Sequence, residues 1–197
     1  IAIENARLFR ETKEALERQT ATAEILRVIS SSPADVQPVF DTIVRNFATL
    51  CGSMFGAVFR FDGELVHFAG AHGFSPEQRE GVRAKYPVRL DDPSVASSRA
   101  ILTRAPVHIQ DILKDPHYDK THATVASWRR MLAVPMLRDG VPLGAIVAAW
   151  QQPGATPKHH VELLNIFADQ AVIAIENVRL FNETKEALER QTATAEI

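Results

Sequence analysis

The chain has 197 residues, of which 46% are hydrophobic and 23% are charged, and its formal net charge is −2. This composition is typical of a soluble globular protein, and the nearly balanced charge gives no electrostatic reason to expect a nucleic-acid partner. The sequence has no long apolar run and only one cysteine. We therefore expect no membrane contact from this segment, no disulfide framework, and a reducing, cytoplasmic location.

The first 32 residues contain neither proline nor glycine and are rich in Ala, Glu, Leu, Arg and Gln, which favour a helix. Pro33 ends this helix. The same segment returns at the end of the chain, because residues 1–25 and 173–197 are identical at 23 of 25 positions. Self-similarity at a fixed offset predicts one unit of a tandem array, with a connecting helix over residues 1–30 and a domain over residues 31–157.

The domain begins with a second helix. Residues 38–52 place Phe40, Ile43, Val44 and Phe47 at helical spacing, and a glycine ends the run.

Strands follow this helix. Asp-Gly pairs at positions 62–63 and 139–140, each between aromatic or β-branched runs, predict two hairpins. A further strand is expected over residues 106–112, and Pro135 indicates an edge or a bulge in the second hairpin. These elements predict an α+β fold with a mostly antiparallel sheet of about five to six strands.

Both faces of the predicted strands are apolar. In the first strand, Phe55, Phe59 and Phe61 alternate with smaller apolar residues. Such a sheet must be covered on both faces. We expect the long terminal helices on one face and a small cap of helices and loops, from about residue 71 to 128, on the other. A cap over a sheet favours a pocket, although alternation does not determine which face it meets.

Residues 158–197 again lack proline and glycine and predict a helix about 60 Å long. Its apolar arc is wide up to about Leu180, which indicates packing on the domain and on a partner together. The arc then narrows to a single seam, which predicts a coiled-coil connector softened by Lys185 and Thr192. The alternatives are a solitary helix in solvent and a helix folded back on its own domain. The expected homodimer interface contains Leu164, Phe167, Ala171, Ala174, Val178, Phe181 and Leu188.

Three stretches carry a resemblance to a known family: ATLCGSMFGAVFRFDGELVHFAGAHGF, SVASSRAILTRAPVHIQDILKDP and RRMLAVPMLRDGVPLGAIVAAW. In this order the sequence resembles the GAF domain family over about residues 25–180. The connecting helices resemble those between tandem GAF units of bacterial multidomain sensors, which often end in a histidine kinase or a nucleotide cyclase. The resemblance implies a GAF/PAS-like fold, a ligand pocket over one sheet face and a parallel dimer, but it names no ligand.

A ligand under the cap would be lined by aromatic and polar side chains. Arg99 is the obvious partner for an anion, and Tyr118 and Trp128 are suited to stack on a flat ring. For each aromatic residue the competing interpretation is an ordinary core position. The predicted ligand-binding residues are Phe59, Phe61, Arg99, His108, Tyr118, His122 and Trp128.

The cofactors that the resemblance suggests are not favoured. Covalent bilin attachment needs a cysteine in the cap, whereas Cys51 ends the second helix, where a buried structural role fits. Cyclic nucleotide remains a disfavoured alternative because the Asn-Lys…Phe…Asp-Glu signature is missing. Haem is a second disfavoured alternative, because the histidines form no complete ligand set. The enzymatic branch that reduces free methionine sulfoxide needs several cysteines, so we expect no metal site and no catalytic residue.

Together these features predict a sensory GAF domain of a cytoplasmic signal-transduction protein. It would bind a small molecule over the sheet and relay its state through dimeric helices to an output domain. We expect this output domain to be a histidine kinase of a two-component system. The alternative is a ligandless spacer that dimerises and relays signals between other sensor domains.

Overall fold

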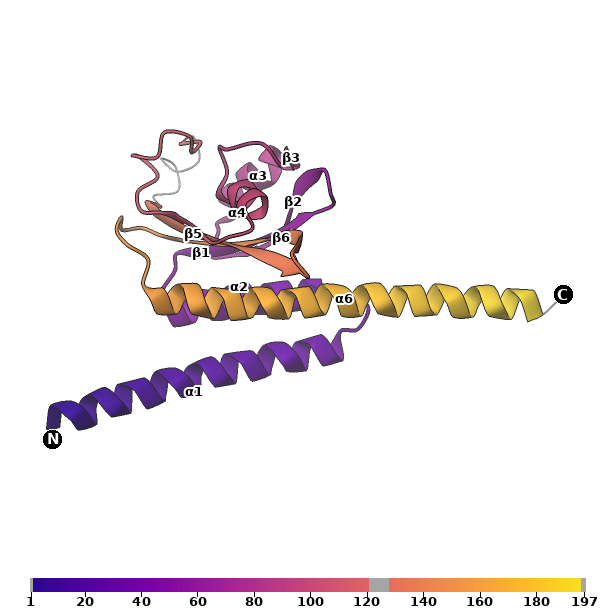
Figure 1. Ribbon diagram of the computed structural model, residues 1–197, viewed down its shortest axis with the longest axis horizontal. Coiled ribbons are helices and arrows are strands. Elements are labelled where there is room, and N and C mark those ends of the chain that lie inside the picture. Colours follow the sequence, from indigo (N-terminus) through magenta and orange to yellow (C-terminus); the bar gives the residue numbers. More distant parts are fainter. Residues whose placement is uncertain (1, 121–127, 196–197) are drawn as a thin grey trace.

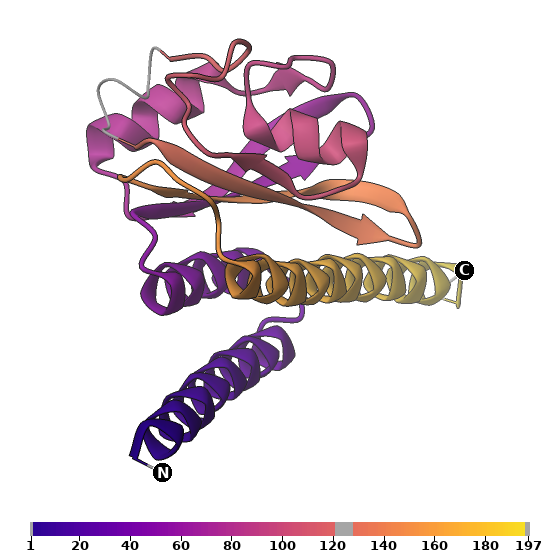
Figure 2. The ribbon, with the colours of Figure 1, turned by 60° about the vertical axis from the view of Figure 1, so that its left-hand side comes forward.

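The computed structural model describes residues 2–120 and 128–195. Long helices cover one face of a six-stranded antiparallel sheet, and short helices with loops cover the other (Figures 1 and 2). The expected α+β class is confirmed. The elements in chain order are α1 (Ala2–Ser31), α2 (Gln37–Cys51), β1 (Phe55–Phe61), β2 (Leu65–His72), α3 (Pro76–Lys85), β3 (Val88–Arg89), α4 (Ala96–Thr103), β4 (Val107–Ile109), β5 (Arg130–Arg138), β6 (Val141–Trp150) and α6 (Lys158–Ala195).

The strands follow the order β3-β2-β1-β6-β5-β4. Both predicted hairpins are present, and the turn between β5 and β6 has positive φ at Asp139 (50°) and Gly140 (79°), as a two-residue type I′ turn requires. Pro135 pairs with Ala145 of β6, while the pairing of β5 with the short β4 ends at Ala133. The proline therefore lies where β5 has a neighbour on one side only, which is where a sheet tolerates proline.

The helix-side core joins α1, α2 and α6 to one face of the sheet. Phe47 of α2 packs edge-to-face on Phe167 of α6, with ring centroids 6.4 Å apart, and on Trp150 of β6 at 6.2 Å. The Trp150 indole N–H donates to the carbonyl oxygen of Cys51 at 3.0 Å. Cys51 is buried in this core, and its burial raises the pKa of the thiol to about 12, as expected for an inert structural cysteine.

The cap-side core lies on the opposite face. The β1 residues Phe55, Ala57 and Phe59 face this side, together with Val147 and Ala149 of β6. The structure thus settles what the alternation left open: the phenylalanine-rich face of β1 meets the cap. Small residues on β6 leave room above the middle of the sheet.

The two long helices are each buried at one end only. Helix α1 is exposed as far as Thr20 and then packs through Ala21, Ile25 and Ile29, whereas α6 is packed from its first turn and exposed beyond Arg179. Figure 1 shows both helices extending past the sheet, α1 toward the N-terminus and α6 toward the C-terminus. No helix in residues 2–120 or 128–195 combines the length and apolar character needed to cross a membrane.

The residues expected at a dimer interface fall into two groups. Leu164, Phe167, Ala171 and Ala174 have exposed fractions of 0–2% because they fill the helix-side core of their own domain. They are therefore not accessible to a partner in this structure. Val178 is half-buried, and Phe181 and Leu188 are exposed. The periodicity predicted a wide apolar arc but not which part of it meets the sheet. The exposed part contains Ile166, Ile173 and Leu180.

Candidate functional site

A cavity of about 50 Å³ lies between the cap and the sheet. Its floor is formed by β1, β5 and β6 through Phe55, Met131 and Val147, and its roof by α3, α4 and the segment around Tyr118. Helix α3 is started by a capping box, in which Ser75 accepts from the backbone N–H of Gln78 and the Gln78 side chain accepts from the backbone N–H of Ser75. The start of α3 is thus set by a local sequence signal, while the sheet supplies the apolar surface below the cap.

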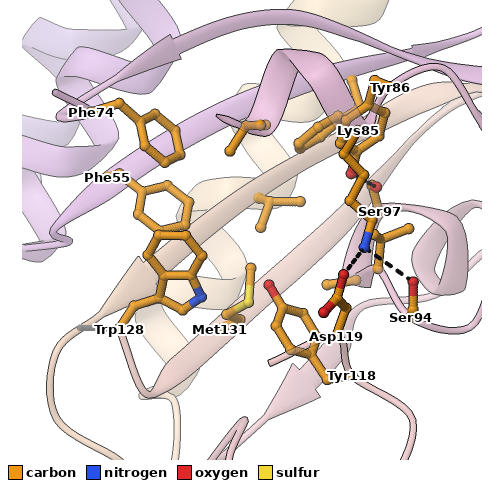
Figure 3. A pocket seen from close by; sticks show the side chains of 15 residues that line it. Phe55, Phe74, Lys85, Tyr86, Ser94, Ser97, Tyr118, Asp119, Trp128 and Met131 are labelled. Atoms are coloured by element: carbon orange, nitrogen blue, oxygen red, sulfur yellow. Dashed lines mark hydrogen bonds and ion pairs between the residues drawn. The ribbon is translucent and has the colours of Figure 1, made fainter. Parts of the chain in front are cut away.

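Aromatic rings make up most of the cavity wall. Phe55 lies 4.4 Å from Phe74 and 4.8 Å from Trp128, measured between ring centroids. On the other side, Phe59 lies 4.8 Å from Tyr86. Figure 3 shows Phe74, Phe55 and Trp128 grouped at one end of the cavity, with the polar groups at the other end.

The polar end is built around an ion pair. The Lys85 ammonium, at the C-terminal end of α3, lies 2.6 Å from a carboxylate oxygen of Asp119 and 3.3 Å from the hydroxyl of Ser94. The Asp119 backbone N–H also donates to the Ser94 carbonyl at 3.0 Å. The Lys85 and Asp119 side chains are 17% and 29% exposed, so the pair is only partly in water.

Two tyrosines add neutral hydroxyls to this site. The Tyr86 hydroxyl lies 3.1 Å from the hydroxyl of Ser97. Burial raises the pKa of Tyr86 and raises the pKa of Tyr118 to about 12. Both phenols are therefore protonated at physiological pH and act as neutral hydrogen-bonding groups.

Trp128 supplies the most distinctive feature. Its side chain is 4% exposed, and its indole N–H is buried with no acceptor at hydrogen-bond distance in the described part of the chain; the polar group that it faces is the Tyr118 hydroxyl, and the N–H lowers the pKa of that hydroxyl against the larger effect of burial. In Figure 3 the indole nitrogen lies on the side of the ring that faces Tyr118 and Met131. A buried donor without an acceptor is unfavourable, and such groups are rare in folded proteins. This donor is therefore available to a ligand in the cavity.

Three of the predicted ligand-binding residues, Phe59, Tyr118 and Trp128, line the cavity together. Phe61 is half-buried on the same sheet face but does not line it. His122 lies outside the described residues.

Two further predicted residues lie elsewhere. Arg99 makes a bidentate ion pair with Asp115 at 2.8 and 2.9 Å, which holds the segment before Tyr118 against α4. His108 is an exposed residue of β4, in an open surface groove that also contains Arg129. The cation at the cavity is Lys85 rather than Arg99. Sequence reasoning missed this lysine because nothing in a short polar helix shows which of its charged residues turns inward.

Among the residues that the structure describes, no cysteine and no group of metal ligands is gathered at this cavity. Cys51 belongs to the helix-side core, so the sheet separates its thiol from the cavity. Within residues 2–120 and 128–195, no three His, Cys, Asp or Glu side chains are grouped to hold a metal ion. What the described residues do offer is an apolar, aromatic enclosure with one ion pair, neutral hydroxyls and an unsatisfied indole N–H.

Comparison with known proteins gives a family and a fold. A GAF domain family model matches residues 33–176. The sequence matches no curated protein with significance.

Many solved structures share the fold. The GAF domain of a phosphoenolpyruvate-protein phosphotransferase from Coxiella burnetii has a TM-score of 0.72 and 12% identity, over 86% of this chain and 98% of that chain. Free methionine-R-sulfoxide reductase from Neisseria meningitidis, solved with its substrate, has a TM-score of 0.67 and 16% identity, over 85% of this chain and 93% of that chain. A domain described as part of a two-component sensor histidine kinase protein from Sinorhizobium meliloti has a TM-score of 0.62 and 12% identity, over 77% of this chain and 97% of that chain. At these identities the likeness establishes the fold.

Proposed function

Because the chain belongs to the GAF domain family, we propose that it is a sensory domain of a cytoplasmic signalling protein. It binds a small molecule in the cap-side cavity and passes the bound state along α6 to an output domain, a histidine kinase. The similar fold in a sensor histidine kinase protein supports this role. The observation that carries the proposal is the unsatisfied indole N–H of Trp128 inside an aromatic cavity.

A direct route for the signal runs through β5. This strand begins two residues after Trp128, contributes Met131 to the cavity floor and ends at Arg138. Arg138 forms an ion pair with Glu176 of α6, close to the point where the helix leaves the domain. A ligand that moves Trp128 or Met131 therefore acts on a rigid strand whose far end holds the exit helix.

The relay requires a second copy beside the exit helix. Ile166, Ile173 and Leu180 are spaced by seven residues on α6 and have exposed fractions of 44–50%. A line of apolar residues with this period is suited to a parallel two-helix seam. The repeated segment at both ends of the chain supports a tandem array, in which α6 of one unit continues as α1 of the next.

The second candidate function is a ligandless spacer, and the size of the cavity favours it. A volume of about 50 Å³ is far below the roughly 300–1,000 Å³ of typical ligand sites. Under this function the aromatic rings of the cap are simply a second core. Binding would require the cap to shift, which is feasible because α3 buries none of its residues.

Native mass spectrometry combined with hydrogen exchange tests the choice. For a sensor, the purified protein carries a small molecule that is released on denaturation. Its removal then speeds amide exchange in β5 and around residues 173–180. The variant Ala96→Leu, which fills the cavity from α4, should abolish the adduct while the protein stays folded. Absence of an adduct, together with unchanged exchange in Ala96→Leu, would favour the spacer.

A further inference from the structure

The charges around the cavity restrict the charge of its ligand. Lys85 and Asp119 are the only charged side chains among the described residues that line it, and they neutralise each other at 2.6 Å. An ionic ligand would have to displace one partner and leave the other without its counter-charge in a partly buried site, which is unfavourable. The lining therefore favours a ligand without ionised groups and disfavours phosphates, carboxylates and ammonium groups.

The hydrogen-bonding groups restrict the ligand further. The Lys85 ammonium and the Tyr86 hydroxyl already have partners within the site, at Asp119 and Ser97. The Trp128 indole N–H has no acceptor at hydrogen-bond distance in the described part of the chain, so a ligand competes for it only with its looser interaction with the Tyr118 hydroxyl, and indole only donates. A ligand that satisfies it must carry an acceptor, such as a carbonyl oxygen, and this acceptor must lie beside Trp128 on the side that faces Tyr118 and Met131.

The walls restrict size and shape. The ring pairs Phe55–Phe74 and Phe59–Tyr86 are tilted by only 31° and 32°, with centroids 4.4 and 4.8 Å apart, so each pair is stacked on itself and offers a guest only the flat outer faces of its rings. The present volume admits only a few water-sized groups. Met131 has a flexible side chain that lies between Trp128 and Tyr118 in the view of Figure 3. Its withdrawal makes space for one ring rather than for a nucleotide or a tetrapyrrole.

We infer that the cavity binds a small, uncharged, single-ring aromatic molecule with one hydrogen-bond acceptor, and that the Trp128 indole N–H is the group that recognises the acceptor. This inference rests on the proposed sensory function and specifies its ligand class. Trp128 adjoins β5, so the residue that reads the acceptor is also at the start of the strand that reaches α6.

A set of matched probes tests the inference by calorimetry at pH 7. Acetophenone has the required carbonyl, and α-methylstyrene has the same shape without an acceptor. Benzoate, benzylammonium and phenylalanine present an anion, a cation and a zwitterion on the same ring. We expect acetophenone to bind about tenfold more tightly than α-methylstyrene, as is typical for satisfying one buried donor. The three charged probes should bind more weakly than acetophenone.

Three variants assign the effect to residues. Trp128→Phe keeps a ring and removes the donor, so the preference for acetophenone over α-methylstyrene should fall to about one. Met131→Ala enlarges the cavity and should tighten binding of both neutral probes. Its control is Met136→Ala, on the same strand but facing the helix-side core, which should not tighten binding. Thermal unfolding of each variant checks that it remains folded.

The outcomes separate the inference from the proposed function. Tighter binding of any charged probe than of acetophenone would overturn the ligand class and leave the sensory function standing. An unchanged probe preference in Trp128→Phe would overturn the role of the indole. If no probe binds to wild type or to Met131→Ala, and no molecule co-purifies, both the inference and the sensory function fail.

Discussion

The two ends of the chain have nearly the same sequence but opposite surroundings. Ile3 of α1 is 87% exposed, whereas its counterpart Ile175 in α6 packs against the helix-side core. At the other end of the segment the situation reverses, because Ala21 is 7% exposed and packed on α2, while Ala193 is exposed. The burial of this segment is thus decided by which domain lies beside it and not by its own residues.

The middle of the segment is different, because it is exposed in both copies. Its large apolar residues are 42–74% exposed whichever end of the chain they occupy. If α6 of one unit continues as α1 of the next, one domain covers the start of the segment and the following domain covers its end. The middle is then covered by neither domain and remains for a partner helix, together with the exposed Ile166 and Ile173 that precede it on α6. The residues concerned are Leu8, Phe9 and Leu16 in α1, and Leu180, Phe181 and Leu188 in α6.

The largest expected effect separates the domain-bound half of α6 from its exposed half. Phe167→Ala removes a fully buried ring and should lower the free energy of unfolding by about 3–5 kcal/mol. Phe181→Ala, fourteen residues later on the same helix, should change it by less than about 0.5 kcal/mol because the ring is exposed. Urea denaturation of monomeric protein measures both. Equal effects would mean that the exit half packs on the domain after all.

Much of the fold was predictable because its signals are local. The Asp-Gly turns, Pro33 and the proline-free ends place the hairpins and the long helices in the sequence. The need to cover a sheet that is apolar on both faces predicts the two layers around it. The two-residue strand β3 was missed, since so short a strand exists only through its pairing with β2.

The site was less predictable, because its residues come together only through tertiary packing. The aromatic residues Phe59, Tyr118 and Trp128 could be named from the sequence, since large aromatic residues on a covered sheet face and in the cap above it are expected to pack between the two. The ion pair could not, because Lys85 and Asp119 are 34 residues apart and each has charged neighbours in sequence. The apolar arc of α6 likewise did not distinguish the face that meets the sheet from the face that meets a partner.

Substitutions in the exposed line of α6 test the proposed seam. Ile173→Glu with Leu180→Glu places charges on two residues that no neighbouring element covers, and in a dimer these charges would oppose their own copies. We expect the dimer dissociation constant to rise at least about 100-fold, equivalent to about 2.7 kcal/mol. Analytical ultracentrifugation over a concentration series measures the change.

A control addresses nonspecific association. Leu102→Glu with Leu113→Glu alters two exposed apolar residues on the cap side and should leave the dissociation constant unchanged. A wild-type protein that stays monomeric at every concentration, or a cap-side pair that is equally disruptive, would argue against the seam on α6.

The stability of the protein should depend on pH through a residue at the start of α6. This part of α6 precedes the repeated segment and has no counterpart in α1. His160 is stacked on Trp150 with ring centroids 5.5 Å apart, and its Nδ1 is buried without a partner in the described residues. Burial is the largest cause that lowers the pKa of His160 from 6.5 to about 4, and repulsion from His159 and then Arg130 adds to it. The unfolded chain therefore takes up a proton at a higher pH than the folded protein does. Stability should fall by about 2 kcal/mol from pH 7 to pH 5 through this residue.

The measurement compares wild type with His160→Phe and with His159→Gln. His160→Phe keeps an apolar ring and should remove about 2 kcal/mol of the pH dependence of unfolding, whereas His159→Gln alters an exposed neighbour and should retain most of it, because burial is the larger cause of the lowered His160 pKa. An identical pH profile in wild type and His160→Phe would show that the residue accepts a proton in the folded state without strain.

The smallest expected effect compares one glutamate in its two copies. Glu4 of α1 pairs with Arg7 at 2.6 Å, and its counterpart Glu176 pairs with Arg179 at 2.9 Å. Only Glu176 has a second partner, Arg138 at the end of β5, and its pKa is lowered first by Arg179 and then by Arg138. Glu176→Gln should therefore loosen the exit helix from the sheet and speed amide exchange over residues 173–180 roughly twofold, the scale of a partly exposed ion pair.

Glu4→Gln makes the same change in nearly the same sequence and should leave exchange in the domain unaltered, because no residue of the sheet is attached to it. Equal responses in the two copies would mean that Arg138 does not hold α6, and the strand β5 would then lose its connection to the exit helix.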